Sequence, residues 1–325
     1  MTTSHVTTTT GTETAATDPH QAAEPPPYPE PDEVDGSEWA QSPVDRPRRP
    51  RRPRAPAPPA LRLTAATLSL LGLLIVGFFV YFYGLSGLAE QRDQTVLDRT
   101  FAGQLALATA PVGPTAVGSP VALLSIPALG ISHLVVVEGT TSEQLAHGPG
   151  HLRSTVLPGQ AGVSVVYGRV AGFGGPFAHL MQLNRGDRIT VTTGQGVSTY
   201  VVESFGTSAQ PTPDHTANRL VLETGNSSLV PQAVVEVSAD LITTALPSPG
   251  GLPQTTVQEN ALAGDPGALV ALLLWSQALL LLSVGGTVAA CRWSARATYL
   301  CAAPVAISLV WLIYENLAIL LPNLN

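Results

Sequence analysis

The sequence predicts a mainly β protein that is held in a membrane by three transmembrane α-helices and preceded by a disordered tail. The chain has 325 residues, of which 45% are hydrophobic and only 12% are charged, against roughly 25% charged in an ordinary soluble domain. Three apolar stretches are long enough to span a bilayer, at residues 63–83, 268–290 and 299–320. Between the first two, short runs of β-forming residues alternate with Gly and Pro turns.

The charged residues and the cysteines exclude several classes of function. The net charge is -7, and all 16 basic residues are arginine because the sequence contains no lysine. We therefore expect no nucleic-acid partner, since nucleic-acid-binding domains carry a basic surface. The two cysteines, Cys291 and Cys301, are too few for a disulfide scaffold or a four-cysteine zinc site. We expect neither a metal nor a cofactor.

Residues 1–60 are predicted to form a disordered, Pro- and Arg-rich tail. They contain so few aliphatic or aromatic residues that burial of apolar surface cannot offset the loss of chain entropy. Because Lys and Arg collect on the cytoplasmic side of a membrane, we expect the tail in the cytoplasm, residues 61–84 as the first transmembrane helix, and the next domain outside. The arginines that support this orientation directly precede the first apolar stretch: Arg46, Arg48, Arg49, Arg51, Arg52 and Arg54.

A helical stalk and a β-rich domain follow the first apolar stretch. Residues 85–120 are assigned to the stalk, because apolar residues recur there at roughly helical spacing. Residues 121–242 are expected to form a barrel or sandwich, with a short helix over 141–146 that Thr141 or Ser142 would cap. Seven runs rich in Val, Ile, Leu, Tyr and Thr predict its strands: 121–126, 134–137, 162–167, 188–192, 199–202, 220–222 and 233–237.

The C-terminal part predicts a helical hairpin in the membrane. Its segments are a Pro- and Gly-rich linker, a second transmembrane helix, a connector and a third transmembrane helix: residues 243–266, 267–290, 291–297 and 298–320. The connector carries Arg292 and Arg296, and with three spans it returns to the cytoplasm, as the charge rule requires. The sequence thus predicts a multi-pass protein of the cell membrane, with the lipid bilayer as a partner.

Several motifs of the β domain have a familiar order and spacing. They lie within residues 121–241 and include Ile126-Pro127-Ala128-Leu129-Gly130-Ile131, Val137-Glu138-Gly139, Gly148-Pro149-Gly150-His151, Pro158-Gly159-Gln160-Ala161-Gly162 and Gly186-Asp187. In these motifs the chain resembles the sortase family, the cysteine transpeptidases that attach proteins to the cell wall of Gram-positive bacteria. The resemblance implies an eight-stranded β-barrel. It also implies a catalytic cysteine, histidine and arginine, with the cysteine attacking the threonyl carbonyl of a Leu-Pro-X-Thr-Gly sorting signal.

Other residues stand at the three catalytic positions that the resemblance implies. The family histidine follows a glycine at the end of a strand, and the matching residue is Arg169. The family cysteine ends a strand after a threonine, and here Thr224 is followed by Gly225. The arginine position aligns with about Gln232. Arginine stays protonated and cannot act as a general base, and both cysteines lie at the second and third apolar spans, so the β domain cannot form a thioester.

These substitutions favour a catalytically inactive pseudosortase over two alternatives. One alternative is a transpeptidase or hydrolase of altered chemistry that uses Ser227 or Ser228, and the other is a structural scaffold of the envelope. Arg169 would pair with a carboxylate of the bound peptide, or would instead form a surface salt bridge near the end of a strand. A structural role is favoured for His151. The pseudosortase would bind a sorting-signal peptide, a cell-wall peptide or an active sortase through a groove that includes Arg169, Thr224, Gly225 and His151.

Two further patterns bear on function and source. Leu252-Pro253-Gln254-Thr255-Thr256 resembles a sorting signal in which Thr256 replaces the glycine. Coincidence within a Pro-rich linker is favoured, and a pseudosubstrate that docks in the barrel's own groove is the alternative. Heavy use of Ala, Gly, Pro and Arg without Lys is typical of GC-rich coding, which together with the resemblance indicates an actinobacterial cell envelope.

Overall fold

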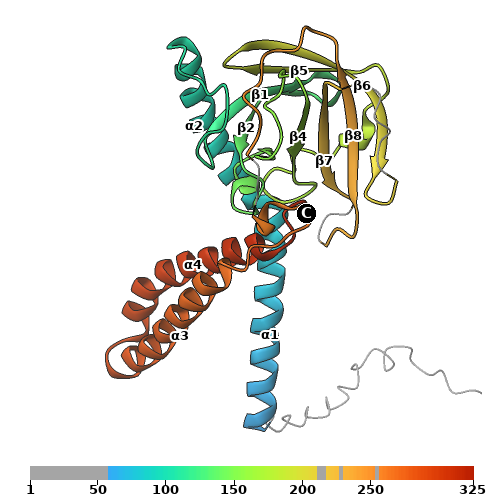
Figure 1. Cartoon of the computed structure of the whole chain (residues 1–325). Helices are drawn as coiled ribbons and strands as arrows, with labels where there is room; N and C mark the ends of the chain where they lie inside the picture. The colour runs from blue at the N-terminus through green and yellow to red at the C-terminus, as the bar shows by residue number, and fades with distance from the viewer. Residues whose placement is uncertain (1–57, 211–216, 227–229, 253–255) are drawn as a thin grey trace, which may run out of the picture. The chain divides into compact units, whose positions relative to one another are not determined.

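The computed structural model describes residues 58–210, 217–226, 230–252 and 256–325. Residues 1–57 of the predicted disordered tail and the candidate serines Ser227 and Ser228 therefore lie outside the described residues. Within the described part, a long helix precedes a β-barrel and a helical hairpin follows it (Figure 1).

The β domain is a closed eight-stranded barrel, which confirms the predicted fold class. Its strands are Pro120–Ile126 (β1), Ile131–Glu138 (β2), Gly150–His151 (β3), Val163–Tyr167 (β4), Arg188–Thr193 (β5), Gly196–Thr207 (β6), Arg219–Gly225 (β7) and Val234–Leu241 (β8). They close in the order β1-β2-β3-β4-β7-β8-β6-β5. Neighbouring strands are antiparallel except for β2 with β3 and β4 with β7, which are parallel.

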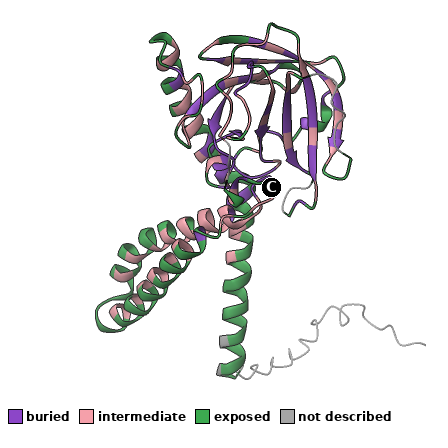
Figure 2. Cartoon of the chain, in the orientation of Figure 1, coloured by how far each residue is buried: buried purple, intermediate pink, exposed green. Residues whose placement is uncertain are grey.

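One apolar core fills the barrel. Side chains alternate between the two faces of a strand, and in β6 every second residue from Ser198 to Gly206 is buried. Val, Ile and Leu side chains make up most of the core, together with Phe177 and Tyr200. The Tyr200 hydroxyl accepts a hydrogen bond from the Gly159 N–H at 2.5 Å, so its polar end is paired. The buried strands contrast with the exposed faces of the long helices in Figure 2.

The predicted strand runs overlap seven of the eight strands, and two local predictions differ from the structure. β3 has only two residues and no run of β-branched side chains, so its sequence carries no strand signal. The predicted helix over 141–146 is a single 3-10 turn, Gln144–Ala146, with no side-chain cap. The predicted cap is wrong because Thr141 hydrogen-bonds to the Gln144 side chain and Ser142 donates to the Leu321 carbonyl oxygen.

The first apolar stretch and the stalk form one continuous helical segment. It comprises α1 (Pro59–Val80), a π-helical turn η2 (Tyr81–Leu85) and α2 (Ser86–Ala106). The Ser86 hydroxyl donates to the Phe82 carbonyl oxygen (2.6 Å) and accepts from the Phe173 N–H (2.8 Å). This bifunctional serine joins the π-helical turn to a loop of the barrel.

Gln94 is one of the side chains that attach α2 to the barrel, together with Ser86 and with Asp93, whose Oδ2 lies 2.6 Å from His147 Nδ1. Gln94 Oε1 accepts from the Val135 N–H (2.8 Å), and Gln94 Nε2 donates to the carbonyl oxygens of Val135 (3.1 Å) and His147 (2.8 Å). The side chain thus pairs with a backbone donor and a backbone acceptor of β2, as a neighbouring strand would.

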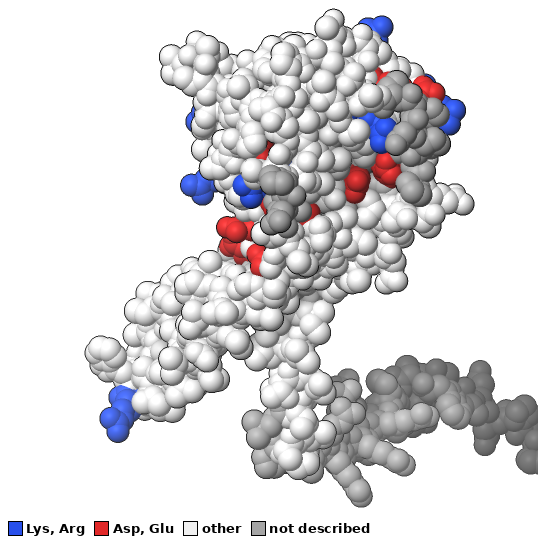
Figure 3. Space-filling view, viewed as in Figure 1, with Lys and Arg blue, Asp and Glu red and all other residues white. Residues whose placement is uncertain are grey.

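A helical hairpin, α3 (Ala268–Arg292) and α4 (Ala295–Leu320), follows the barrel. The chain has three helical segments that are long and apolar enough to cross a membrane among the described residues. Arg292 ends α3 and Arg296 lies in the first turn of α4, and Figure 3 shows basic atoms at the end of the hairpin. α4 meets the first helix through aromatic side chains: the Tyr314 hydroxyl donates to the Leu74 carbonyl oxygen at 2.7 Å.

Candidate functional site

The parallel pairing of β4 and β7 brings together two positions that are far apart in the sequence. Tyr167 lies opposite Glu223, and the N–H of Gly168 donates to the Glu223 carbonyl oxygen at 2.9 Å. Arg169 and Gly225 therefore come next to the same end of two adjacent strands. We define the β4–β7 site by these side chains and the loop that covers them: Arg169, Thr224, Gly225 and residues 140–145.

Arg169 is fully buried, and neutral groups satisfy its guanidinium. Nε donates to the Leu145 carbonyl oxygen (3.2 Å), Nη2 donates to the Ser142 carbonyl oxygen (2.8 Å), and Nη1 donates to Asn325 Oδ1. The guanidinium carbon lies 4.9 Å from the centroid of the Phe173 ring, which is cation–π geometry. Burial lowers the pKa of Arg169 to about 9, so the side chain remains charged at neutral pH.

The expectation of a surface salt bridge at Arg169 is wrong. The residue is 0% exposed, and no carboxylate lies within salt-bridge distance of it among the residues that the structure describes. A buried charge without a counter-ion is costly unless oriented dipoles stabilise it. The carbonyl oxygens and the aromatic ring supply those dipoles here.

Gly225 offers a backbone donor in a position that has no space for a side chain. Its N–H donates to the Leu324 carbonyl oxygen at 3.1 Å. A Cβ on Gly225 would lie 2.5 Å from that oxygen and 2.7 Å from Pro231 Cβ. The adjacent Thr224 is buried, and its hydroxyl has no hydrogen-bond partner within the described part of the chain.

The other two predicted site residues are held by their own neighbours. His151 is buried in β3, with Nδ1 3.0 Å from Glu138 Oε2 and Nε2 2.9 Å from the Val156 carbonyl oxygen. Both ring nitrogens are therefore engaged within the barrel wall. Gln232 is exposed between β7 and β8, where its N–H donates to Asn226 Oδ1 at 2.9 Å.

The cysteines and the sorting-signal-like string lie in other parts of the fold. Cys291 is in the last turn of α3, and Cys301 is in the second turn of α4; both are exposed. The N–H of Leu252 donates to the Arg153 carbonyl oxygen at 2.8 Å. The three residues after Leu252 lie outside the described part of the chain.

One segment that contacts both Arg169 and Gly225 is not among the residues that the sequence predicts for the site. This C-terminal segment, Leu321–Asn325, follows α4 directly, and its last three residues are 0% exposed. The pair Leu321-Pro322 was a signal that could have identified it, because the same pair opens the sorting-signal pattern.

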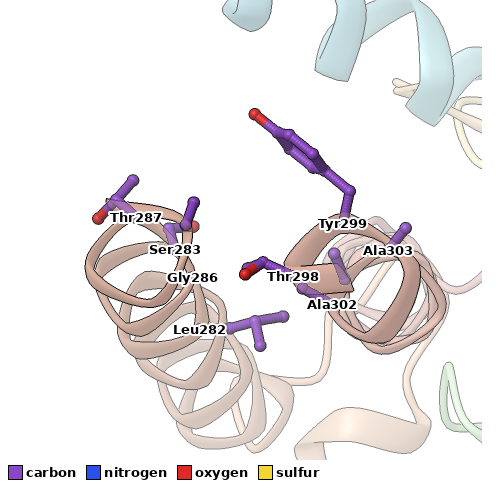
Figure 4. A pocket seen from close by; sticks show the side chains of 10 residues that line it. Leu282, Ser283, Gly286, Thr287, Thr298, Tyr299, Ala302 and Ala303 are labelled. Atoms are coloured by element: carbon purple, nitrogen blue, oxygen red, sulfur yellow. The ribbon is translucent and has the colours of Figure 1, made fainter. Parts of the chain in front are cut away.

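Neither a metal-binding cluster among the described residues nor an acid–base group for neutral pH in the pocket between α3 and α4 is found. Among the residues that the structure describes, no group of three or more His, Cys, Asp or Glu side chains could hold a metal ion. A pocket of about 320 Å³ lies between α3 and α4 (Figure 4). Small, hydroxyl and apolar side chains line it, including Ser283, Gly286 and Thr298, so it holds no group that could act as an acid or a base at neutral pH.

Comparison with known proteins gives one family-model match and several similar solved structures. The model of the Sortase domain matches residues 124–230. Sortase E from Streptomyces avermitilis is 29% identical, with 40% of this chain and 91% of that chain covered and a TM-score of 0.34. Sortase C-1 from Actinomyces oris is 23% identical, with 48% and 99% covered and a TM-score of 0.35. A sortase D5 transpeptidase from Clostridium perfringens is 20% identical, with 47% and 99% covered and a TM-score of 0.39. No curated protein matches the chain.

Proposed function

We propose that the protein is a membrane-anchored pseudosortase, since the model of the Sortase domain matches residues 124–230. In this proposal the β4–β7 site binds a sorting-signal peptide or another partner of the Gram-positive cell envelope and does not catalyse transpeptidation. Arg169, Thr224 and Gly225 are the proposed binding residues, and His151 is proposed to have a structural role.

The observation that carries the proposal is the environment of Arg169. A sortase-type reaction needs a group that gives up and takes back a proton beside the nucleophile. Arg169 occupies the position that aligns with the family histidine, and all the partners of its guanidinium are neutral. A guanidinium that stays charged in this setting can bind an oxygen atom but cannot act as a base at neutral pH.

The nucleophile is the second part of the argument. The chain has two cysteines, both in the α3–α4 hairpin, and Gly225 has no side chain to attack a carbonyl. Ser227 and Ser228 remain the alternative nucleophiles of an altered enzyme. They are three residues or fewer from Gly225 in the sequence, so a test for residual catalysis must include them.

The proposed location is the cell membrane, with the barrel outside and the N-terminal tail inside. Three apolar helical segments and the arginines before α1 and between α3 and α4 support this topology, because basic residues favour the cytoplasmic side.

The function is tested with the full chain in lipid nanodiscs, incubated with a Leu-Pro-X-Thr-Gly peptide and an amine acceptor. We expect saturable peptide binding without any cleaved or transferred product by mass spectrometry. Product formation that is lost in the Ser227→Ala, Ser228→Ala variant would identify an altered enzyme. A chain that neither binds nor turns over the peptide would contradict the peptide-binding proposal and leave the structural scaffold.

A further inference from the structure

The C-terminal segment Leu321–Asn325 lies on the β4–β7 site as a bound peptide would, in a turn that is closed by a hydrogen bond from the Asn325 N–H to the Pro322 carbonyl oxygen (3.1 Å). Its sequence, Leu-Pro-Asn-Leu-Asn, has the first two residues of the Leu-Pro-X-Thr-Gly pattern and differs at the fourth and fifth. It contacts both strand ends that define the site, since Arg169 follows β4 and Gly225 ends β7.

The segment resembles a bound sorting signal most closely at the carbonyl group of its fourth residue, Leu324. The Leu324 carbonyl oxygen accepts hydrogen bonds from the N–H groups of Gly225 (3.1 Å) and Val170 (3.4 Å). In a sorting signal the fourth residue is the threonine whose carbonyl group is attacked. Here the equivalent carbonyl oxygen lies against the residue that replaces the cysteine.

The side chains of the segment are also bound. Leu324 packs in an apolar cluster with Leu145, Tyr167 and Val234. Asn325 Oδ1 accepts from the Arg169 guanidinium. The segment is therefore held by an apolar pocket and by a buried cation at neighbouring residues.

The remaining contacts hold the first and third residues of the segment, Leu321 and Asn323. Asn323 Nδ2 donates to the carbonyl oxygens of Thr140 (2.7 Å) and Asn260 (3.0 Å), and the Asn323 N–H donates to the Ala263 carbonyl oxygen (2.9 Å). The Ser142 hydroxyl donates to the Leu321 carbonyl oxygen at 3.0 Å. The loop that covers Arg169 thus also holds the segment, so that one set of residues supports both.

We propose that Leu321–Asn325 is a peptide ligand of the β4–β7 site supplied in cis, and that a peptide in trans enters the site only after this segment leaves. The claim that a peptide in trans enters the site rests on the peptide-binding function proposed above. Because the segment is joined directly to α4, it competes at an effective concentration on the order of millimolar. A change at the end of the membrane hairpin would therefore control access to the barrel.

The cis contact is tested by hydrogen exchange on the full chain in nanodiscs. Leu324→Glu places a charge in the apolar pocket and should expel the segment, which raises exchange at Val170 and Gly225 by on the order of tenfold or more, since their acceptor is lost. Ile242→Glu is the matched control, because Ile242 is 56% exposed on the barrel. Unchanged protection of β5 and β6 would show that the variant barrel is folded.

A second variant and a binding measurement complete the test. Asn325→Ala removes one of the hydrogen-bond partners of Arg169 and leaves Leu324 in place, so it should give a smaller rise in exchange. A fluorescent Leu-Pro-Asn-Leu-Asn peptide should bind Leu324→Glu on the order of tenfold more tightly than it binds the parent chain or Ile242→Glu.

Hydrogen exchange tests the cis ligand, and peptide binding tests the peptide-binding function. Exchange at Gly225 that is as fast in the parent chain as in Leu324→Glu would overturn the cis ligand. If exchange rises in Leu324→Glu but no variant binds either peptide, the cis contact stands and the peptide-binding function fails.

Discussion

At the scale of single residues, Arg169 lies between the carbonyl oxygens of Ser142 and Leu145, with its charged face against Phe173. A histidine in this position could change its protonation near neutral pH, whereas an arginine keeps its proton and its charge. The Arg169 side chain is therefore suited to holding an oxygen atom and not to transferring a proton. In the structure that atom is the Oδ1 of Asn325.

Glu223 gives the barrel a predictable dependence on pH. Burial, with a smaller contribution from Glu236 on the adjacent strand β8, raises the pKa of Glu223 from 4.5 to about 7. The folded state thus binds this proton more tightly than the unfolded state. The resulting stabilisation is present at low pH and is lost as the pH rises through about 7.

We therefore expect Glu223→Gln to be more stable than the parent chain at pH 8 and to match it near pH 4.5. Thermal unfolding of the full chain in detergent measures this difference, at roughly 2–4 °C for each kcal/mol. Glu143→Gln, at an exposed position, is the control and should not change the pH profile. If the unfolding temperatures of the parent chain and Glu223→Gln change in parallel with pH, the raised pKa of Glu223 would be contradicted.

At the scale of elements, a few side chains join the helices to the barrel. Ser86 connects the π-helical turn to the loop at Phe173, and Gln94 connects α2 to β2. A π-helical turn inside a helix commonly marks a functional or strained position. In this chain it is the place where the first apolar helix meets the barrel.

The contribution of Gln94 can be measured. Gln94→Ala removes three hydrogen bonds to the backbone of β2 and the following loop, at a cost of about 1–3 kcal/mol for the groups left unpaired. We expect faster hydrogen exchange in α2 with unchanged exchange in β5 and β6. Thr100→Ala, whose hydroxyl bonds only within the exposed face of α2, should behave like the parent chain. Equal protection of α2 in both variants would show that other contacts hold the helix.

At the scale of the whole molecule, the proposed topology places the barrel and the α3–α4 turn on opposite sides of the membrane. Trp293 lies at that turn and is 89% exposed, and Ser132 is exposed on β2. Either position can carry a single cysteine after Cys291→Ser and Cys301→Ser remove the natural thiols.

An impermeant maleimide applied to intact cells should label Ser132→Cys and leave Trp293→Cys unlabelled. Both should react after the cells are permeabilised, since the charge rule places the arginine-bearing turn inside. Labelling of Trp293→Cys in intact cells would reverse the orientation of the hairpin.

The amino-acid sequence was enough to predict the barrel and the three apolar helical segments. Those features depend on local hydrophobic pattern and on the order of motifs, which the chain displays directly. Two local predictions failed for the same reason: β3 and the cap of the 141–146 turn depend on neighbours that are distant in sequence.

Only the tertiary structure decided what lies on Arg169 and Gly225. Residues 252–256 match the Leu-Pro-X-Thr-Gly pattern at more positions than residues 321–325 do. The segment that contacts the site is nevertheless Leu321–Asn325. No local pattern encodes that contact, because it joins residues 156 positions apart in the chain. Burial of a charged arginine without a carboxylate became possible only when the barrel, its covering loop and the end of α4 came together around it.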